Sequence, residues 1–271
     1  MSCVSIFLAI KGMFSFFTAL PIDVEQKHVD SMNREFWLVP IVGLFYGLFA
    51  GFVFCLTCVC TSRFIAAAAT IFCLSAMNRF LHLDGTVDMG DGLIVAGKKE
   101  DHVRALKDTL VGAGGTVTGI MVVLMLFAEY SSLNVVEFVL FAVNAEIMAK
   151  NTQVVTAAFG NAGNGMAGDS VRYTTPLSLI KSTALSAIII LALCFLWECL
   201  CRDVFTGCNK VENCWAPVVV GLIMSIIWGL IMANVANRNF GIVNGDVLGA
   251  TNETSRVITI LFMIFVDFFL E

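Results

Sequence analysis

The chain has 271 residues, of which 58% are hydrophobic and only 14% are charged. An ordinary soluble domain carries about 25% charged residues, so this composition and a mean hydropathy of +0.88 indicate an integral membrane protein. No segment has the clustered basic residues of a nucleic-acid-binding surface or the length of a separate soluble domain. We therefore expect a single polytopic domain over residues 1–271, partnered by the lipid bilayer and by no nucleic acid.

A membrane-spanning helix needs about 20 predominantly apolar residues. The first 20 residues are apolar but contain Lys11, which predicts a partly inserted or interfacial N-terminal helix. About seven transmembrane helices are expected after it, over 36–62, 64–81, 109–128, 135–149, 177–200, 214–237 and 257–270. The predicted fold class is therefore an all-α integral membrane protein, whose oligomeric state the sequence leaves open.

The ten cysteines include a cluster at Cys55, Cys58 and Cys60 that could form a metal site. We favour simple packing, because cysteine behaves as a small apolar residue and zinc sites usually show two separated ligand pairs. A disulfide between Cys208 and Cys214 is the alternative left open.

Alternating the predicted helices across the bilayer assigns a side to each connecting segment. The polar, glycine-rich segments then share one side: 82–112, 150–176 and 237–256. Arg63, Arg202 and Lys210 fall on the other side, and the remaining 13 of the 16 lysines and arginines fall on the first, with Lys11 counted there. The excess of basic residues marks the cytoplasmic side, so we predict a multi-pass protein of the cell membrane whose site faces the cytoplasm.

The first candidate site is a group of carboxylates in a largely apolar chain. Asp84, Asp88 and Asp91 are spaced i, i+4 and i+7, which places them on one face of a helix. Like charges on one face repel, and carboxylates are the hard oxygen ligands that Mg²⁺ or Mn²⁺ prefers. The spacing therefore predicts that the three aspartates bind Mg²⁺, with Mn²⁺ as an alternative.

A second candidate follows about 20 residues later. Arg104, Lys107 and Asp108 precede a glycine-rich turn with Gly112 and Gly115, where the next helix is expected to begin. Helix N-termini and glycine amides bind phosphate, so this segment indicates a phosphoanhydride substrate beside the metal. The alternative is that its basic residues only obey the positive-inside rule.

Further polar residues could complete the site. Asp246 and Glu253 could supply ligands or a general base, although a turn and a capped helix would also explain their segment. Glu146 and Lys150, spaced i, i+4, could pair with each other or face the substrate. His82 is a further candidate base.

At these residues the chain resembles the cobalamin synthase family, the adenosylcobinamide-GDP ribazoletransferases. Three motifs occur in the family's order across most of the chain. They are His82-Leu-Asp84-Gly85…Asp88…Asp91-Gly92, then Arg104…Lys107-Asp108…Gly112…Gly115, then Gly245-Asp246-Val-Leu-Gly249-Ala250…Glu253. Many members have Lys-Asp-Ser-Arg where this chain has Lys107-Asp-Thr-Leu110, so Arg104 or Lys107 would have to serve the phosphates.

The resemblance implies an Mg-dependent phosphotransferase of cobalamin biosynthesis whose substrates are a corrinoid-GDP and α-ribazole or its 5′-phosphate. A ribazole hydroxyl would attack the phosphate next to the cobinamide arm, and GMP would leave. Asp84, Asp88 and Asp91 would hold the metal. The proton acceptor stays open among Asp246, Glu253 and His82.

Two rival functions deserve a comparison. CDP-alcohol phosphotransferases also use aspartates on membrane helices, but their pattern has Ala-Arg after the first Asp-Gly and three residues between the last two aspartates. Here Asp88-Met follows, and only two residues separate Asp88 from Asp91. A small-solute transporter would place polar groups at mid-membrane depth, whereas the central thirds of these predicted spans carry almost no charge.

Overall fold

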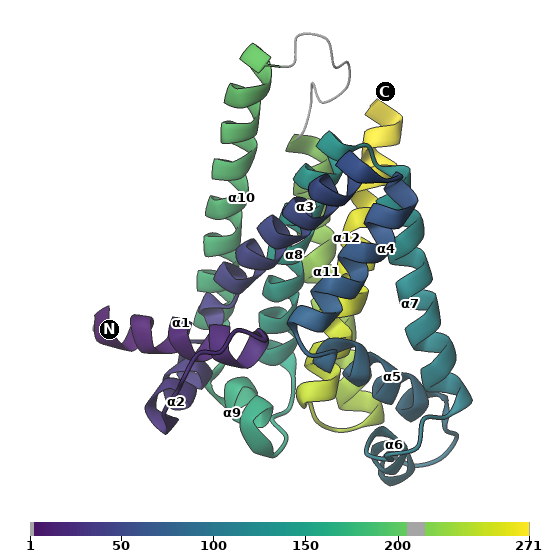
Figure 1. The fold of residues 1–271 in the computed structure, drawn as a ribbon. Helices are drawn as coiled ribbons and strands as arrows, with labels where there is room; N and C mark the ends of the chain where they lie inside the picture. The colour runs from purple at the N-terminus through teal and green to yellow at the C-terminus, as the bar shows by residue number, and fades with distance from the viewer. Residues whose placement is uncertain (1–2, 205–214, 271) are drawn as a thin grey trace.

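The computed structural model describes residues 3–204 and 215–270, and every element of these residues is helical apart from one isolated bridge between Ala162 and Val243. The all-α prediction is therefore confirmed for this part of the chain. The long helices are α3 (Pro40–Cys60), α4 (Arg63–Met77), α7 (Ala113–Ser132), α8 (Val135–Phe159), α10 (Pro176–Val204), α11 (Trp215–Asn239) and α12 (Gly245–Leu270). Figure 1 shows them running roughly side by side.

Shorter helices gather at one end of this bundle (Figure 1). They are α1 (Cys3–Phe17), α2 (Gln26–Arg34), the 3-10 turn η1 (Phe36–Leu38), α5 (Leu81–Ile94), α6 (Lys99–Leu106) and α9 (Gly165–Tyr173). The turn between α11 and α12 lies at the same end, so the three polar segments do meet there. Helix α1 runs across the bundle axis in Figure 1, while its interfacial placement stays a prediction.

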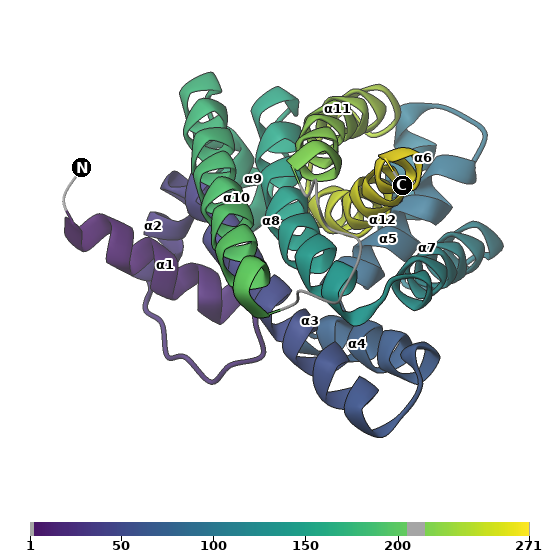
Figure 2. The same ribbon diagram turned by 90° about the horizontal axis from the view of Figure 1, so that it is seen from above.

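The chain is a multi-pass membrane protein, but the count of seven spans is not confirmed. Four of the described helices are long and apolar enough to cross a membrane, namely α3 with its preceding turn, α7, α10 and α11. A fifth span results if α4 and α5 count as one bent pair. Helices α8 and α12 are long enough but carry charged residues, and they pack against each other and against α3, α5 and α11 (Figure 2). Their polar side chains are therefore screened from lipid by neighbouring helices.

The three segments expected to be loops are largely helical. Residues 82–112 hold α5 and α6, residues 150–176 hold the end of α8 and all of α9, and residues 237–256 hold the start of α12. The polarity that suggested loops arises instead from helices that bury polar faces in the protein. The proposed Cys208–Cys214 bridge lies outside the described residues, while Cys55, Cys58 and Cys60 are free.

A sharp bend places the aspartate helix. Arg79 and Phe80 have φ values of 57° and 60°, which non-glycine residues rarely adopt, and α5 leaves this bend at 91° to α4. The Arg79 guanidinium donates to the carbonyl oxygen of Thr18 at 2.8 Å, which ties the bend to the end of α1. The bend therefore turns α5 across the end of the bundle instead of along it.

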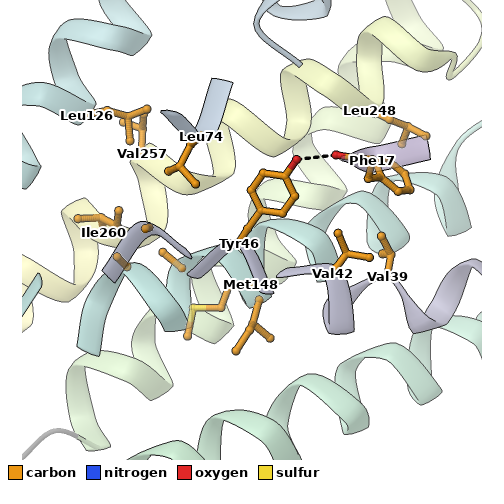
Figure 3. Close-up of a cluster of buried hydrophobic side chains, with 14 of the residues drawn as sticks. Phe17, Val39, Val42, Tyr46, Leu74, Leu126, Met148, Leu248, Val257 and Ile260 are labelled. Carbon is orange, nitrogen blue, oxygen red and sulfur yellow. Dashed lines mark hydrogen bonds between the residues drawn. The ribbon is translucent and has the colours of Figure 1, made fainter. Parts of the chain in front are cut away.

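The apolar core lies between α3, α4, α8 and α12. Tyr46 is fully buried there, and its hydroxyl donates to the carbonyl oxygen of Phe17 at 2.5 Å (Figure 3). This bond joins the centre of the bundle to the end of α1. It thereby holds the Phe17 backbone beside the polar end of the molecule.

Candidate functional site

Helix α5 carries the three aspartates in the helical register that their spacing predicts. Asp84 is exposed, and Asp88 and Asp91 are half-buried. The carboxylates of Asp84, Asp246 and Asp91 lie close enough to Asp88 to repel its charge. Helix α12 therefore adds a fourth carboxylate, from Asp246, to the group that the sequence placed on one helix.

Asp91 has a partner of its own. Its two carboxylate oxygens accept hydrogen bonds from the backbone amides of Gly112 at 2.6 Å and Gly115 at 2.7 Å. Gly112 is the N-cap of α7, so the helix begins at the predicted glycine-rich turn. A carboxylate there compensates the unpaired amides of the first helical turn and the positive end of the helix dipole. The anion-binding turn is thus occupied by a protein carboxylate.

The described residues contain no group of three or more His, Cys, Asp or Glu side chains arranged to hold a metal ion. The three-aspartate metal site therefore stays a prediction. Mg²⁺ needs only one or two carboxylates when substrate phosphates and water supply its other ligands. Asp84 and Asp88, one helical turn apart, fit that smaller requirement, and Asp246 stands beside them.

Helices α5 and α12 touch where this site is built. A Cβ atom on Gly85 would lie 2.7 Å from both the Cα and the carbonyl oxygen of Asp246. Backbone atoms cannot move away cheaply, so the absence of a side chain at Gly85 allows the contact. The first and third sequence motifs therefore meet directly, as expected if both serve one site.

This contact gives a testable prediction. Gly85→Ala should push α5 from α12, lower the free energy of unfolding by about 1–3 kcal/mol and reduce any activity of the site. Gly245→Ala is the matched control, because the nearest atom to its Cβ would be Ala167 Cβ at 3.8 Å. Denaturant titration in detergent measures both variants, and equal stability of the two would contradict the packing argument.

The basic residues of the second motif are at the surface. Arg104 pairs with Asp101 at 3.1 Å and is 79% exposed, Lys107 is exposed, and Asp108 accepts from the amide of Leu110 at 3.0 Å. Lys107 is close enough to Asp246 to interact with its charge. Lys107 is therefore the basic residue of this motif that the structure brings nearest to the carboxylates.

A buried charged cluster lies behind the carboxylates. Arg256 on α12 pairs with Glu146 of α8 at 2.6 Å and with Glu253 at 2.8 Å. Glu253 in turn lies 3.6 Å from the Nδ1 atom of His82, whose Nε2 atom is 3.5 Å from the Lys150 ammonium. All five side chains are at most 6% exposed. Of the sequence candidates, Glu146, Lys150, Glu253 and His82 thus come together.

Arg256 is the member that sequence reasoning missed. The last predicted span began at residue 257, which left Arg256 as a flanking residue. The sequence did contain a signal for this role, because Arg256 follows Glu253 by three residues and so lies on the same face of a helix.

A cavity of about 150 Å³ adjoins the carboxylates. Its lining includes His82, Asp84 and Asp246, together with apolar side chains from α1, α2, η1 and α9. Glu146, Lys150, Glu253 and Arg256 are not among the lining residues. His82 is therefore the one member of the charged cluster, among the described residues, that reaches the cavity.

Known proteins resemble this chain in sequence. Residues 9–264 match the family model described as cobalamin-5-phosphate synthase. The chain belongs to this family. An adenosylcobinamide-GDP ribazoletransferase of Methanocella arvoryzae is 31% identical to it over 92% of both chains. The ribazoletransferase of Methanosarcina mazei is 28% identical over 95% of this chain and 91% of its own. No solved structure matches the chain.

The matched region contains the residues of the candidate site. The match to the cobalamin-5-phosphate synthase family includes α5, α7, α8 and most of α12, so the carboxylates, the capped turn and the buried cluster lie within the shared region. The resemblance inferred from three motifs is therefore confirmed.

Proposed function

We propose that this protein is an adenosylcobinamide-GDP ribazoletransferase that joins α-ribazole, or its 5′-phosphate, to adenosylcobinamide-GDP and releases GMP. The meeting of the first and third motifs at Gly85 and Asp246 carries this proposal, because it gathers four carboxylates, two of which, Asp84 and Asp246, line a cavity. The family match and the names of the relatives support the same reaction. They favour it over a CDP-alcohol phosphotransferase or a small-solute transporter.

The reaction is phosphoryl transfer, which depends on charge neutralisation and positioning. A hydroxyl of the ribazole forms a bond to the phosphorus next to the cobinamide arm, the anhydride bond breaks, and GMP takes the bonding electrons. The hydroxyl proton passes to a base at the cavity, where Asp246 and His82 both stand. Glu253 is a weaker candidate than the sequence suggested, because it does not line the cavity and its carboxylate is paired with Arg256.

We propose Asp84 and Asp88 as the residues that hold Mg²⁺ or Mn²⁺. When bound, the ion would neutralise the diphosphate charge and the charge that develops on GMP. Lys107, on the Asp246 side of the group, contributes further positive charge at the surface. Asp91 holds the start of α7 against α5 and so keeps the neighbouring carboxylates in place.

The site would face the cytoplasm of the cell membrane. At the end of the molecule that carries α5, α6 and α9, the basic residues Lys98, Lys99, Arg104 and Lys107 are exposed, and an excess of basic residues marks the cytoplasmic side. Lys150 and Arg256, which the count along the sequence also assigned to this side, are buried between helices. A soluble corrinoid nucleotide would then reach the carboxylates without crossing the bilayer.

The decisive experiment is an assay of GMP release by the purified protein. With adenosylcobinamide-GDP and α-ribazole, we expect GMP release in the presence of Mg²⁺ and at least a hundredfold less in excess EDTA. Restored Mg²⁺ should restore the rate. Rapid GMP release in EDTA would overturn the metal assignment, and no GMP under any condition would overturn the function.

A further inference from the structure

The lining of the cavity beside the carboxylates combines apolar and polar residues. Its buried apolar residues include Phe17, Met32, Phe36 and Leu248, each at most 8% exposed. Figure 3 shows Phe17 and Leu248 near each other, with the Phe17 backbone held by Tyr46. Its polar lining includes Asn78, His82, Asp84, Gln153 and Asp246.

The size of the cavity limits its occupant. A volume of about 150 Å³ is comparable to cavities that hold one small aromatic molecule such as benzene. Neither a corrin ring nor a complete guanosine diphosphate fits such a space. Among the parts of the proposed substrates, only a flat base has a suitable size.

The apolar lining favours the benzimidazole base of ribazole over the guanine base of the other substrate. Guanine carries several N–H and C=O groups on its edges, and burying them against phenylalanine and methionine without partners would be costly. Ribazole is the riboside of a methylated benzimidazole, whose ring edge is apolar apart from one nitrogen. Aromatic rings favour such a partner, and the Phe17 ring lies 6.4 Å from that of Phe36 and 6.1 Å from that of His82, centroid to centroid.

The polar residues of the lining connect the cavity to the carboxylates, because Asp84 and Asp246 belong to both. The side-chain oxygens of Asn78 and Gln153 are buried and accept no hydrogen bond from any described residue. Their amide nitrogens are engaged, with His82 Nδ1 at 3.2 Å and the carbonyl oxygen of Leu248 at 2.9 Å. Buried acceptors are normally satisfied, so these two oxygens mark an incomplete hydrogen-bond network beside the cavity.

We propose that this cavity binds the benzimidazole base of the ribazole acceptor, with its ribose directed toward Asp84 and Asp246. The inference rests on the proposed function and adds which of the two substrates binds in the cavity. The base lies against Phe17, Phe36, Met32 and Leu248. This orientation delivers a ribose hydroxyl to the carboxylates, where its oxygen forms the new bond to phosphorus and its proton leaves to the site's base.

Filling the cavity tests the proposal. Ala167 lines it from α9 at the edge of the core and is only partly buried, so Ala167→Leu should narrow the space. We expect the KM for α-ribazole to rise at least tenfold, while the KM for adenosylcobinamide-GDP and kcat stay within about twofold. Ala68→Leu is the matched control, since Ala68 lies on α4 in a separate apolar groove. Phe36→Leu, which removes an aromatic ring from the lining, should also raise the KM for α-ribazole.

Binding measured without turnover separates this inference from the proposed function. Calorimetry of the detergent-solubilised protein with α-ribazole alone should give a Kd at least tenfold weaker for Ala167→Leu than for wild type or Ala68→Leu. If wild type releases GMP but Ala167→Leu leaves ribazole affinity unchanged, or weakens only adenosylcobinamide-GDP, the cavity does not bind the ribazole base. If wild type releases no GMP, the proposed function itself fails.

Discussion

Asp88→Asn should reduce kcat for GMP release by about 100- to 1000-fold. Asp88 is half-buried on α5 and stands between the carboxylates of Asp84, Asp91 and Asp246. If it holds a divalent ion, removing its charge removes several kcal/mol of transition-state stabilisation, and each 1.4 kcal/mol is a factor of ten. The neutral amide retains the shape of the side chain, so the loss reports on charge.

The same variant should be at least as stable as wild type without added metal. Replacing one of four crowded carboxylates relieves repulsion between like charges, a trade of stability for activity that is common at functional sites. Thermal unfolding in EDTA measures this, and Asp23→Asn, an exposed aspartate away from the site, is the matched control. Turnover of Asp88→Asn within threefold of wild type would rule out the metal role of this residue.

Local pattern was enough to predict much of the candidate site. The spacing of Asp84, Asp88 and Asp91 required one helical face, and the glycines at 112 and 115 marked the start of α7. Alternating the predicted spans across the bilayer placed the segments that hold α5, α9 and the α11–α12 turn on one side, and these elements do lie at one end of the bundle. These predictions depend on the spacing of residues close in sequence and on the positions of apolar spans, and one sequence supplies both.

Contacts between distant helices could not be predicted in the same way. Asp91, which the sequence assigned to a metal, instead accepts hydrogen bonds from the start of α7. This was not predicted, because the spacing of residues shows which helical face they share but not what packs against that face. Helices α8 and α12 were shortened in the prediction, since Lys150 and Arg256 were placed at the membrane surface. Arg256 is stabilised in the interior by its ion pair with Glu146 of α8, and Lys150 lies 3.5 Å from His82 of α5. Hydropathy along one chain does not reveal such contacts between helices.

The buried cluster around Arg256 leads to the largest expected effect on stability. Arg256 is 1% exposed, and it pairs with two carboxylates, Glu146 at 2.6 Å and Glu253 at 2.8 Å. A buried ion pair adds little net stability when complete, because desolvation of the charges offsets their attraction. Removing one partner is different, since it leaves the other charge buried without compensation, at a cost of about 3–5 kcal/mol.

Arg256→Met should therefore lower the free energy of unfolding by about 3–5 kcal/mol, measured by tryptophan fluorescence during denaturant titration in detergent. Methionine retains most of the apolar volume, so the loss reflects the two unpaired glutamates more than a cavity. Adding Glu146→Gln to this variant should recover part of the stability, because one of the two uncompensated charges is then gone. Arg104→Met is the control, since Arg104 is 79% exposed and its loss should change stability by no more than about 0.5 kcal/mol. Equal stability of the Arg256 and Arg104 variants would mean that the glutamates do not depend on Arg256, and the cluster would then have no part in holding α8 against α12.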